Sequence, residues 1–214
     1  MAKVMAVNAG SSSLKYKLFE MPEGKVLCSG MADRIGHDDG VFKIKFDGKE
    51  LKKTLPLHDH AQAVKMLLQA LTETGVLKEL DEIKCVGHRV VQGGKYFSRS
   101  AEFDEDTAKK IAMLTPLDPL HAEAHLTGWK AFVQALPGVP EIAVFDTAFH
   151  QTMEPEDYVF PIPYEYTTEY DCRRYGAHGT SHKYLSIKGQ EDFLQGYEHT
   201  RILSLIHISE PTRQ

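Results

Sequence analysis

The chain has 214 residues, of which 42% are hydrophobic and 26% charged, and its formal net charge at pH 7 is −5. This composition is that of an ordinary globular protein, long enough for one large domain or two small ones. It offers no basic field for nucleic acid or membrane, no apolar run near the ~20 residues that span a bilayer and no signal peptide, so we expect a cytoplasmic protein.

Possible metal and disulfide residues are scattered. The three cysteines, Cys28, Cys85 and Cys172, are far apart in the sequence, and no two of them form a Cys-x-x-Cys motif. We therefore expect reduced, buried thiols. His37 and the His-Asp-His segment at 58–60 lie in predicted loops beside carboxylates, where histidines are usually solvated rather than metal ligands.

The N-terminus predicts a strand over the apolar run at 4–7, a tight turn of small residues at 8–13, and a second strand whose residues alternate from 13 to 18. Backbone N–H groups and hydroxyls in this turn, with Lys15 just behind it, suit phosphate oxygens, and Gly10 allows close approach. The turn is not a Walker loop, because the required glycine and lysine spacing is absent and a strand follows. The alternative is a plain hairpin connection.

Further strands are predicted at 26–31, 41–46 and 51–55, with turns at 36–40 and 47–48. Asp59 is a suitable N-cap for an amphipathic helix whose apolar positions run from 61 to 71, ending near Gly75. The result would be a meander of strands with a helix covering one face.

A short strand is predicted at 83–87, followed by His-Arg-Val-Val-Gln-Gly-Gly at 88–94. Arg89 at the carboxyl end of this strand is suited to hold a small anion over an apolar floor that includes Val91. The alternative is an arginine that pairs with a surface carboxylate or stabilises its own loop.

The central segment predicts helices at 104–113 and 120–136. Asp104 or Asp106 would cap the first, and Trp129, Phe132 and Val133 would form the apolar face of the second. A buried strand at 142–145 would then deliver a carboxylate, Asp146, to the edge of the sheet where α/β folds place their chemistry. The alternative is an aspartate that caps the following turn.

The last third predicts an extended segment at 158–163, a short polar helix at 165–174 and a strand at 201–205. His178 lies between two glycines, ahead of Thr180 or Ser181 as a helix cap, and could donate a hydrogen bond to phosphoryl oxygens. A zinc pair with His182 would need a continuous helix, which Gly179 disfavours.

Four segments resemble signatures of the acetate kinase family, within the superfamily of acetate and sugar kinases, Hsp70 and actin. They are Asn-Ala-Gly-Ser-Ser-Ser-Leu-Lys at 8–15, Gly-His-Arg-Val-Val-Gln-Gly-Gly at 87–94, Val-Phe-Asp-Thr-Ala-Phe-His-Gln-Thr-Met at 144–153 and Tyr-Gly-Ala-His-Gly-Thr-Ser-His at 175–182. The resemblance covers about residues 3–205, roughly the first half of a family member.

The resemblance implies an α/β fold: an actin-like (ribonuclease H-like) ATPase domain at 1–150, with a mixed sheet and flanking helices. The beginning of a second, similar domain would follow at 151–205. Residues 206–214 depart from the family and are expected to be a non-native tail.

The implied activity is reversible transfer of a phosphoryl group from ATP to acetate, with Mg²⁺ or Mn²⁺ as cofactor and a homodimer as the full-length form. Asp146 and His178 would be catalytic residues, Arg89 would bind the acetate carboxylate, and Val91 would line the pocket for its methyl group. The acyl pocket would also include Ala177 and Leu117, with Leu120 as an alternative to Leu117. The phosphates would be bound by Lys15, Ser11, Ser12 and Ser13, and the metal by Asn8.

The residues leave three questions open. Ala177 stands where the family has Phe, so a larger pocket and a propionate or butyrate kinase are alternatives. The family's later glycine loops, second arginine and metal-binding glutamate have no counterpart in these residues, so a catalytically inactive partial domain is another. Acetate is already ionised at pH 7, which favours an orienting role for Asp146 over that of a base.

Overall fold

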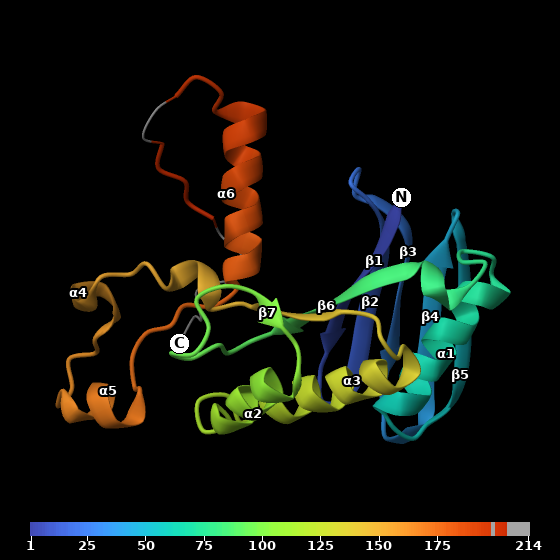
Figure 1. The fold of residues 1–214 in the computed structure, drawn as a ribbon, viewed down its shortest axis with the longest axis horizontal. Coiled ribbons are helices and arrows are strands. Elements are labelled where there is room, and N and C mark those ends of the chain that lie inside the picture. Colours follow the sequence, from blue (N-terminus) through green and yellow to red (C-terminus); the bar gives the residue numbers. More distant parts are fainter. Residues whose placement is uncertain (198–199, 205–214) are drawn as a thin grey trace, which may run out of the picture. The chain divides into compact units, whose positions relative to one another are not determined.

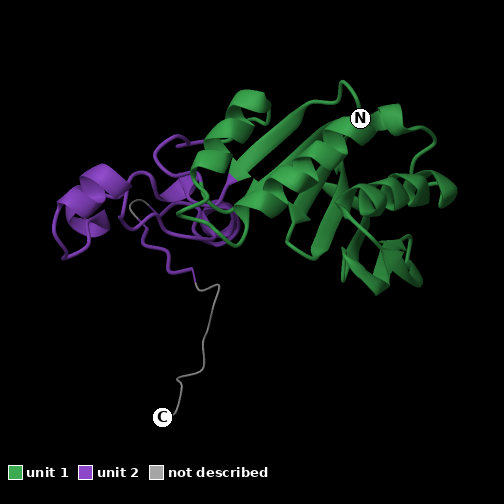
Figure 2. Ribbon diagram, turned by 90° about the horizontal axis from the view of Figure 1, so that it is seen from below, with its two compact units in different colours: residues 1–92, 100–144 green, residues 93–99, 145–214 purple. Residues whose placement is uncertain are grey.

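The computed structural model of the protein describes residues 1–197 and 200–204. The chain divides into two compact units (Figure 2). Unit 1 consists of Met1–Gln92 and Ser100–Val144, and unit 2 consists of Gly93–Arg99 and the residues from Phe145 onward.

Unit 1 is a mixed sheet with helices, and most of the predicted elements are present (Figure 1). Its elements are β1 (Ala2–Ala9), β2 (Ser13–Met21), β3 (Lys25–Asp33), β4 (His37–Phe46), β5 (Lys49–Leu57), α1 (His60–Glu73), the 3-10 turn η1 (Leu80–Glu82), β6 (Ile83–Val90), β7 (Ala101–Glu102), α2 (Glu105–Met113), α3 (Ala122–Ala135) and β8 (Glu141–Phe145), whose last residue belongs to unit 2. The prediction of an α/β fold with a mixed sheet and flanking helices is therefore confirmed.

The strand order across the sheet is β5-β4-β3-β2-β1-β6-β8-β7. Strands β1 to β5 form the antiparallel meander that the alternating segments predicted, and β6 adds to β1 in parallel. Parallel pairing brings the carboxyl ends of β1 and β6 to the same edge of the sheet. Because Val7 pairs with His88, Asn8 and Arg89 lie at that edge.

Alternate strand residues form the core of unit 1. Met5, Leu14 and Leu18 are fully buried on the face of the sheet that α1 and α3 cover. Asp59 caps α1 by accepting a hydrogen bond from the Gln62 amide at 2.7 Å, and Asp104 caps α2 from the Thr107 amide at 2.8 Å. Both caps agree with the sequence, since these side chains satisfy the otherwise unpaired first amides of a helix.

Several boundaries in unit 1 differ from the predictions. The turn expected at 36–40 lies earlier, at Arg34–Gly36, because both of these residues take positive φ and β4 begins at His37. Strand β6 continues to Val90 because β1 supports it as a parallel neighbour. Val133 is 40% exposed, because a position about 100° around α3 from Phe132 falls outside the buried stripe.

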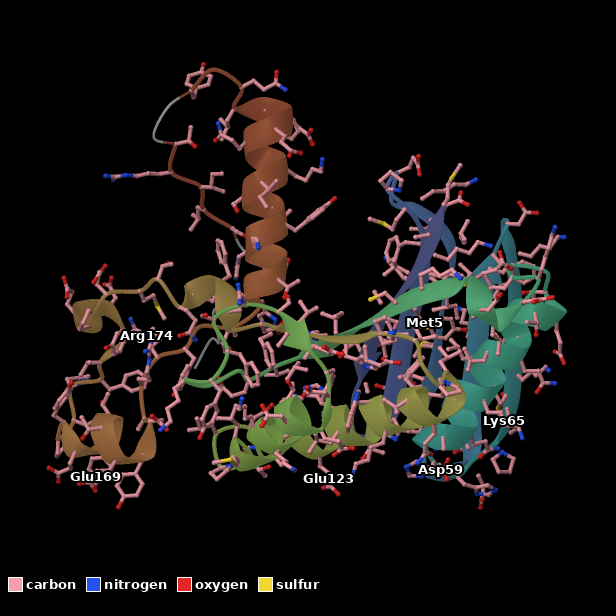
Figure 3. The ribbon with its side chains drawn as sticks, in the orientation of Figure 1. Met5, Asp59, Lys65, Glu123, Glu169 and Arg174 are labelled. Carbon is pink, nitrogen blue, oxygen red and sulfur yellow. The ribbon has the colours of Figure 1, made fainter. Side chains whose placement is uncertain are left out.

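The described residues of unit 2 form the 3-10 turn η2 and three helices. These are η2 (Ala148–His150), α4 (Pro155–Tyr158), α5 (Glu165–Tyr170) and α6 (Gly179–Phe193). Phe97 and Phe145 stack with ring centroids 4.2 Å apart, and the Arg174 side chain, labelled in Figure 3, donates to the Asp157 carbonyl at 2.7 Å.

The helix predicted at 165–174 ends at Tyr170, because Asp171 adopts a left-handed conformation with φ of 54°. Residues 201–204 are not in a strand, in contrast to the prediction, because no neighbouring strand pairs with them within the described chain. Residue 205 and the expected tail at 206–214 lie outside the described residues. The domain boundaries expected at 150 and 205 stay predictions.

The cysteines are free thiols: Cys28 is buried, whereas Cys85 and Cys172 are partly exposed, so the expectation that all three are buried is wrong for two of them. Within residues 1–197 and 200–204, the helices are all too short or too polar to traverse a bilayer.

Candidate functional site

The predicted phosphate turn is a tight connection between β1 and β2. Asn8 and Lys15 are cross-strand partners, and Gly10 donates its backbone N–H to the Ser13 carbonyl at 2.8 Å. The two side chains stand on the face of the sheet opposite to Met5, because successive strand residues alternate between faces. Pairing in the hairpin therefore places the side chains of Asn8 and Lys15 next to each other on that face.

Two carbonyl oxygens of the Ser-rich turn are hydrogen-bonded to neighbouring segments of unit 1. His60 Nε2 lies 2.8 Å from the Gly10 carbonyl oxygen, and the Ile35 amide donates to the Ser12 carbonyl at 2.9 Å. Ser11 and Ser12 are exposed, and Ser13 is half-buried at the start of β2. The expectation that the histidines at 58–60 are solvated loop residues is wrong for His60, which is 6% exposed as the first residue of α1.

Arg89 joins this hairpin at one cavity of about 610 Å³. Five cationic side chains line it together with Asn8, and the described lining residues include no acidic side chain. The cationic residues are Lys15, Lys17, Lys43, Lys45 and Arg89. Such an arrangement attracts anions, and an arginine among them can bind a carboxylate through two parallel hydrogen bonds.

Lys43 and Lys45 were not singled out from the sequence. They alternate with the buried Phe42 and Ile44, so both point to the cavity face of β4. Both contact Glu50, at 2.8 and 3.2 Å, and these contacts lower the pKa of the Glu50 carboxyl, chiefly through the hydrogen bond from Lys43. The alternation at 41–46 was the signal that could have found them, once β4 was placed in the same sheet as Lys15.

The other predicted residues of unit 1, the three serines of the turn (Ser11, Ser12 and Ser13) included, do not line this cavity. Val91 is half-buried just after β6, and Leu117 is half-buried in the turn after α2, whereas Leu120 is 78% exposed. The backbone amide of Val91 donates to His125 Nε2 at 3.2 Å, and the same ring contacts the Ala9 carbonyl. His125 is a site residue that local sequence patterns missed.

The side chains around Asn8 could hold a metal ion only if an anion such as phosphate were bound with it. Among the described residues, no three His, Cys, Asp or Glu side chains gather where they could hold a metal ion. Asn8 can offer one amide oxygen, and the cations of the cavity repel a bare dication while attracting phosphates. Mg²⁺ commonly binds through one or two protein groups plus substrate phosphates and water, so these residues fit a Mg²⁺–phosphate complex.

Unit 2 builds its own polar centre at Asp146, directly after β8. The Asp146 side chain is 3% exposed, and its Oδ1 accepts a hydrogen bond from the Thr180 hydroxyl at 3.3 Å. Oδ2 lies 4.0 Å from His178 Nδ1, which is an ion-pair distance rather than a hydrogen bond. The structure therefore brings together the two residues predicted to be catalytic.

A close backbone contact holds this pair. The Gly179 amide donates to the Asp146 carbonyl at 2.8 Å, and a Cβ at Gly179 would lie 2.2 Å from that oxygen. His178 is the N-cap of α6 with φ of 53°, so the prediction of Thr180 or Ser181 as the cap is wrong. The helix starts two residues earlier, because Gly179 allows it to approach Asp146, and Thr180 instead bonds the Asp146 carboxylate.

Neighbouring loops complete the centre in unit 2. The buried Thr147 accepts a hydrogen bond at Oγ1 from the Gly93 amide at 3.0 Å, which ties the glycine pair after Arg89 to the residue after Asp146. Ala177 is exposed, and its carbonyl lies 3.1 Å from His150 Nε2. Neither Thr147 nor His150 was predicted, since a contact between such distant segments leaves no local pattern.

Two solved structures that are named as kinases resemble this chain. An acetate kinase from Porphyromonas gingivalis matches with a TM-score of 0.85 and 40% identity, over 89% of this chain and 49% of that one. A propionate kinase from Francisella tularensis matches with a TM-score of 0.86 and 38% identity, over 92% of this chain and 50% of that one.

Curated relatives that are similar in sequence are also named acetate kinases. An acetate kinase of Bacillus velezensis is 50% identical over 204 residues, which are 95% of this chain and 52% of the relative, and one of Bacillus subtilis is 48% identical over the same share of each. The chain thus spans about half the length of the curated relatives it matches. The family model of the acetokinase family matches residues 3–210. By sequence and by fold, this chain belongs to the acetokinase family.

Proposed function

We propose that the chain supplies the acetate-binding and phosphoryl-binding groups of an acetate kinase. In the reaction, a carboxylate oxygen of acetate bonds to the γ-phosphorus of ATP while the bond to the β–γ bridging oxygen breaks, giving acetyl phosphate and ADP. The observation that carries the proposal is the cavity shared by Asn8, Lys15 and Arg89, which combines several cations with a carboxylate-binding arginine.

Acetate would be held by Arg89 through its carboxylate. The half-buried Val91 would contact the methyl group, with Leu117 as a further apolar neighbour. Charge-assisted, bidentate hydrogen bonds from arginine give both strength and orientation. The proposal thus gives Arg89 most of the binding free energy and Val91 a part in selecting a short acyl chain.

In unit 1, phosphoryl oxygens would contact Lys15, with the turn of Ser11, Ser12 and Ser13 beneath the phosphates. In unit 2, His178 would be the group that donates to a phosphoryl oxygen. Phosphoryl transfer passes through a loose transition state whose charge is spread over the oxygens, so catalysis consists mainly of alignment and charge stabilisation. Asn8 would hold Mg²⁺ or Mn²⁺, which when bound would neutralise phosphate charge.

Asp146 has a different role in this proposal. Acetate is ionised at neutral pH, so its attack on phosphorus requires no general base. The Asp146 carboxylate accepts from Thr180 and lies 4.0 Å from His178, an arrangement that would orient the imidazole toward a phosphoryl oxygen. We therefore assign Asp146 to orientation of His178 and of metal-bound water.

The direct test is formation of acetyl phosphate, trapped as the hydroxamate, from acetate and Mg-ATP. It should be run on this chain and on a version extended to the length of its relatives. We expect turnover by the extended version that falls sharply in Arg89→Ala and is retained in Arg99→Ala, an exposed arginine outside the cavity. Equal activity in both variants would refute the role of Arg89.

A second candidate is a kinase for propionate or butyrate. Ala177 replaces the phenylalanine expected in the acyl pocket, and one structural relative is named a propionate kinase. A hydrophobic pocket distinguishes one methylene by only ~1–3 kcal/mol, so overlap between the acids is expected. Turnover measured with acetate, propionate and butyrate in parallel separates the candidates.

A third candidate is a partial domain that binds substrates without turnover. It is favoured by the coverage of 52% of the Bacillus velezensis relative. Calorimetry with Mg-ATP and with acetate, combined with the hydroxamate assay on the 214-residue chain, tests it. Turnover by this chain would exclude it. The homodimer stays a prediction of the resemblance, and the cytoplasmic location stays a prediction from the composition.

A further inference from the structure

His125 does not line the cavity of unit 1, but it contacts the residue after Asn8 and the second residue after Arg89. It is 3% exposed on α3, and both ring nitrogens contact backbone. Nδ1 lies 3.1 Å from the Ala9 carbonyl oxygen, and Nε2 lies 3.2 Å from the Val91 amide nitrogen. One ring therefore bridges the end of β1 and the end of β6.

These two partners determine the protonation state of the ring. A carbonyl oxygen can only accept and an amide N–H can only donate, so Nδ1 must carry the hydrogen and Nε2 must be a bare acceptor. A protonated ring would have a hydrogen on each nitrogen and could not accept from Val91. Burial also lowers the pKa of His125 to about 4, so the neutral form is the one present at pH 7.

The two backbone groups belong to the proposed ligand-binding segments. Ala9 separates Asn8 from the Ser-rich turn, and Val91 follows Arg89 by two residues. Helix α3 also approaches β1 closely at a second point, because a Cβ at Gly128 would lie 2.5 Å from the Ala9 Cβ. Two adjacent turns of α3 thus fix Ala9, one by packing and one by a hydrogen bond.

We infer that His125 is a positioning residue that holds the phosphate turn and the carboxylate-binding segment at a fixed separation, acting as a neutral imidazole hydrogen-bonded to both. The effect that this bridge would have on the binding of acetate and ATP rests on the proposed function. The bridge itself does not, and the two can be measured separately.

Charged neighbours of the ring have opposing effects. Asp118 favours the protonated form, whereas His121 and Arg89 disfavour it. His121 stacks on His125 at a centroid distance of 6.1 Å, and its Nδ1 is 2.6 Å from Asp118 Oδ1. Asp118 is therefore already engaged by His121, and these groups do not displace the neutral state that the backbone contacts require.

The test uses two substitutions that each keep one hydrogen bond. In His125→Asn the side-chain NH₂ can take the place of Nδ1 and donate to Ala9, leaving the Val91 amide without its acceptor. In His125→Gln the longer side chain can place its oxygen near Nε2 and accept from Val91. Hydrogen exchange of the Val91 amide, followed by NMR, should be about tenfold faster in His125→Asn than in His125→Gln.

Two further measurements keep the inference falsifiable if a variant unfolds. The ¹⁵N shifts of the His125 ring in the unmodified chain should show hydrogen on Nδ1 at pH 7, and hydrogen on Nε2 would overturn the inference. The matched control is His121→Asn, whose side chain is 47% exposed and which should leave Val91 exchange unchanged. Equal exchange in all three variants would also overturn it.

Acetate titration of the same samples separates the bridge from the function. We expect the acetate dissociation constant to rise several-fold in His125→Asn and less in His125→Gln. If the unmodified chain fails to bind acetate, the proposed function is contradicted, while the ring tautomer and the Val91 exchange still decide the role of His125. If the unmodified chain binds acetate and every variant binds it equally, the bridge has no part in binding, and the inferred consequence for acetate is wrong even where the ring tautomer and the Val91 exchange confirm the bridge.

Discussion

The two polar centres of this chain are built in different ways. In unit 1, Asn8, Lys15 and Arg89 project from neighbouring strands, and strand register determines which side chains share the cavity. In unit 2, Asp146 and His178 come from a strand end and a helix start, and a backbone contact through Gly179 holds them together. The centre of unit 1 therefore depends on the alternation of side chains along strands, whereas the centre of unit 2 depends on the absence of a side chain at Gly179.

This difference implies different sensitivities to mutation. A sheet surface tolerates changes at one side chain, because the backbone hydrogen bonds of the ladder remain. A centre held by close backbone approach depends on a single glycine, since any Cβ must displace a carbonyl oxygen. We therefore expect substitutions in unit 1 to change binding and substitutions at Gly179 to change stability.

The largest effect is expected for Gly179→Ala. The added Cβ would lie 2.2 Å from the Asp146 carbonyl oxygen and 2.9 Å from the Phe149 Cβ, so the start of α6 must move away. We expect a loss of about 3 kcal/mol in the free energy of unfolding, at the upper end for overpacking. Hydrogen exchange of the α6 amides measures it.

The matched control lies in the same helix. A Cβ at Gly189 would meet nothing closer than Ile202 Cδ1 at 3.8 Å, so Gly189→Ala should stabilise α6 by up to ~1 kcal/mol through helix propensity. If the two alanine substitutions had equal effects, the close contact at Gly179 would not be what holds Asp146 and His178 together.

The next effect is a pH dependence that originates in unit 1. Burial lowers the pKa of His125 from 6.5 to about 4. Above pH 6.5 the ring is neutral in both the folded and the unfolded chain, but between 6.5 and 4 only the unfolded chain gains the proton. Stability should therefore fall with decreasing pH in this window by about 1.4 kcal/mol per pH unit. Urea unfolding at several pH values measures this slope.

Carboxylates elsewhere also titrate in this window, so the comparison is with His125→Gln. The glutamine cannot take up a proton, so its stability should depend less on pH between 6.5 and 4 than that of the unmodified chain. Parallel curves for the two proteins would show that His125 is not held neutral by the fold.

A smaller effect, on binding rather than folding, is expected for Arg89→Ala. Loss of a charge-assisted hydrogen bond to a carboxylate corresponds to about 2 kcal/mol, so the acetate dissociation constant should rise more than tenfold. Arg89→Lys should recover part of the affinity, since it keeps the charge but not the bidentate geometry. Calorimetry measures both, and unchanged affinity in Arg89→Ala would place acetate elsewhere.

The smallest effect concerns acid specificity in unit 2. Ala177→Phe, made in the version extended to the length of its relatives, should favour acetate over propionate by about 1 kcal/mol in kcat/KM, the scale set by one methylene. The measurement is the ratio of kcat/KM for the two acids. An unchanged ratio would remove Ala177 from the acyl pocket.

Much of unit 1 could be predicted from the sequence. The apolar run at 4–7, the alternation at 13–18 and 41–46 and the caps Asp59 and Asp104 depend only on residues close together in the chain. The pairing of Asn8 with Lys15 also follows from one tight turn. Local periodicity and capping are short-range physics, so these features could be inferred before any packing was known.

Tertiary structure alone decided the rest. The hydrogen bond between His125 and Ala9 spans 116 positions in sequence, and His60 became buried because α1 packs beneath the Ser-rich turn. The start of α6 at Gly179 likewise depends on the Asp146 carbonyl, a partner 33 residues earlier (179 − 146). Such contacts form only when packing brings distant backbone groups within hydrogen-bond distance, and the residues involved show no periodic pattern of their own.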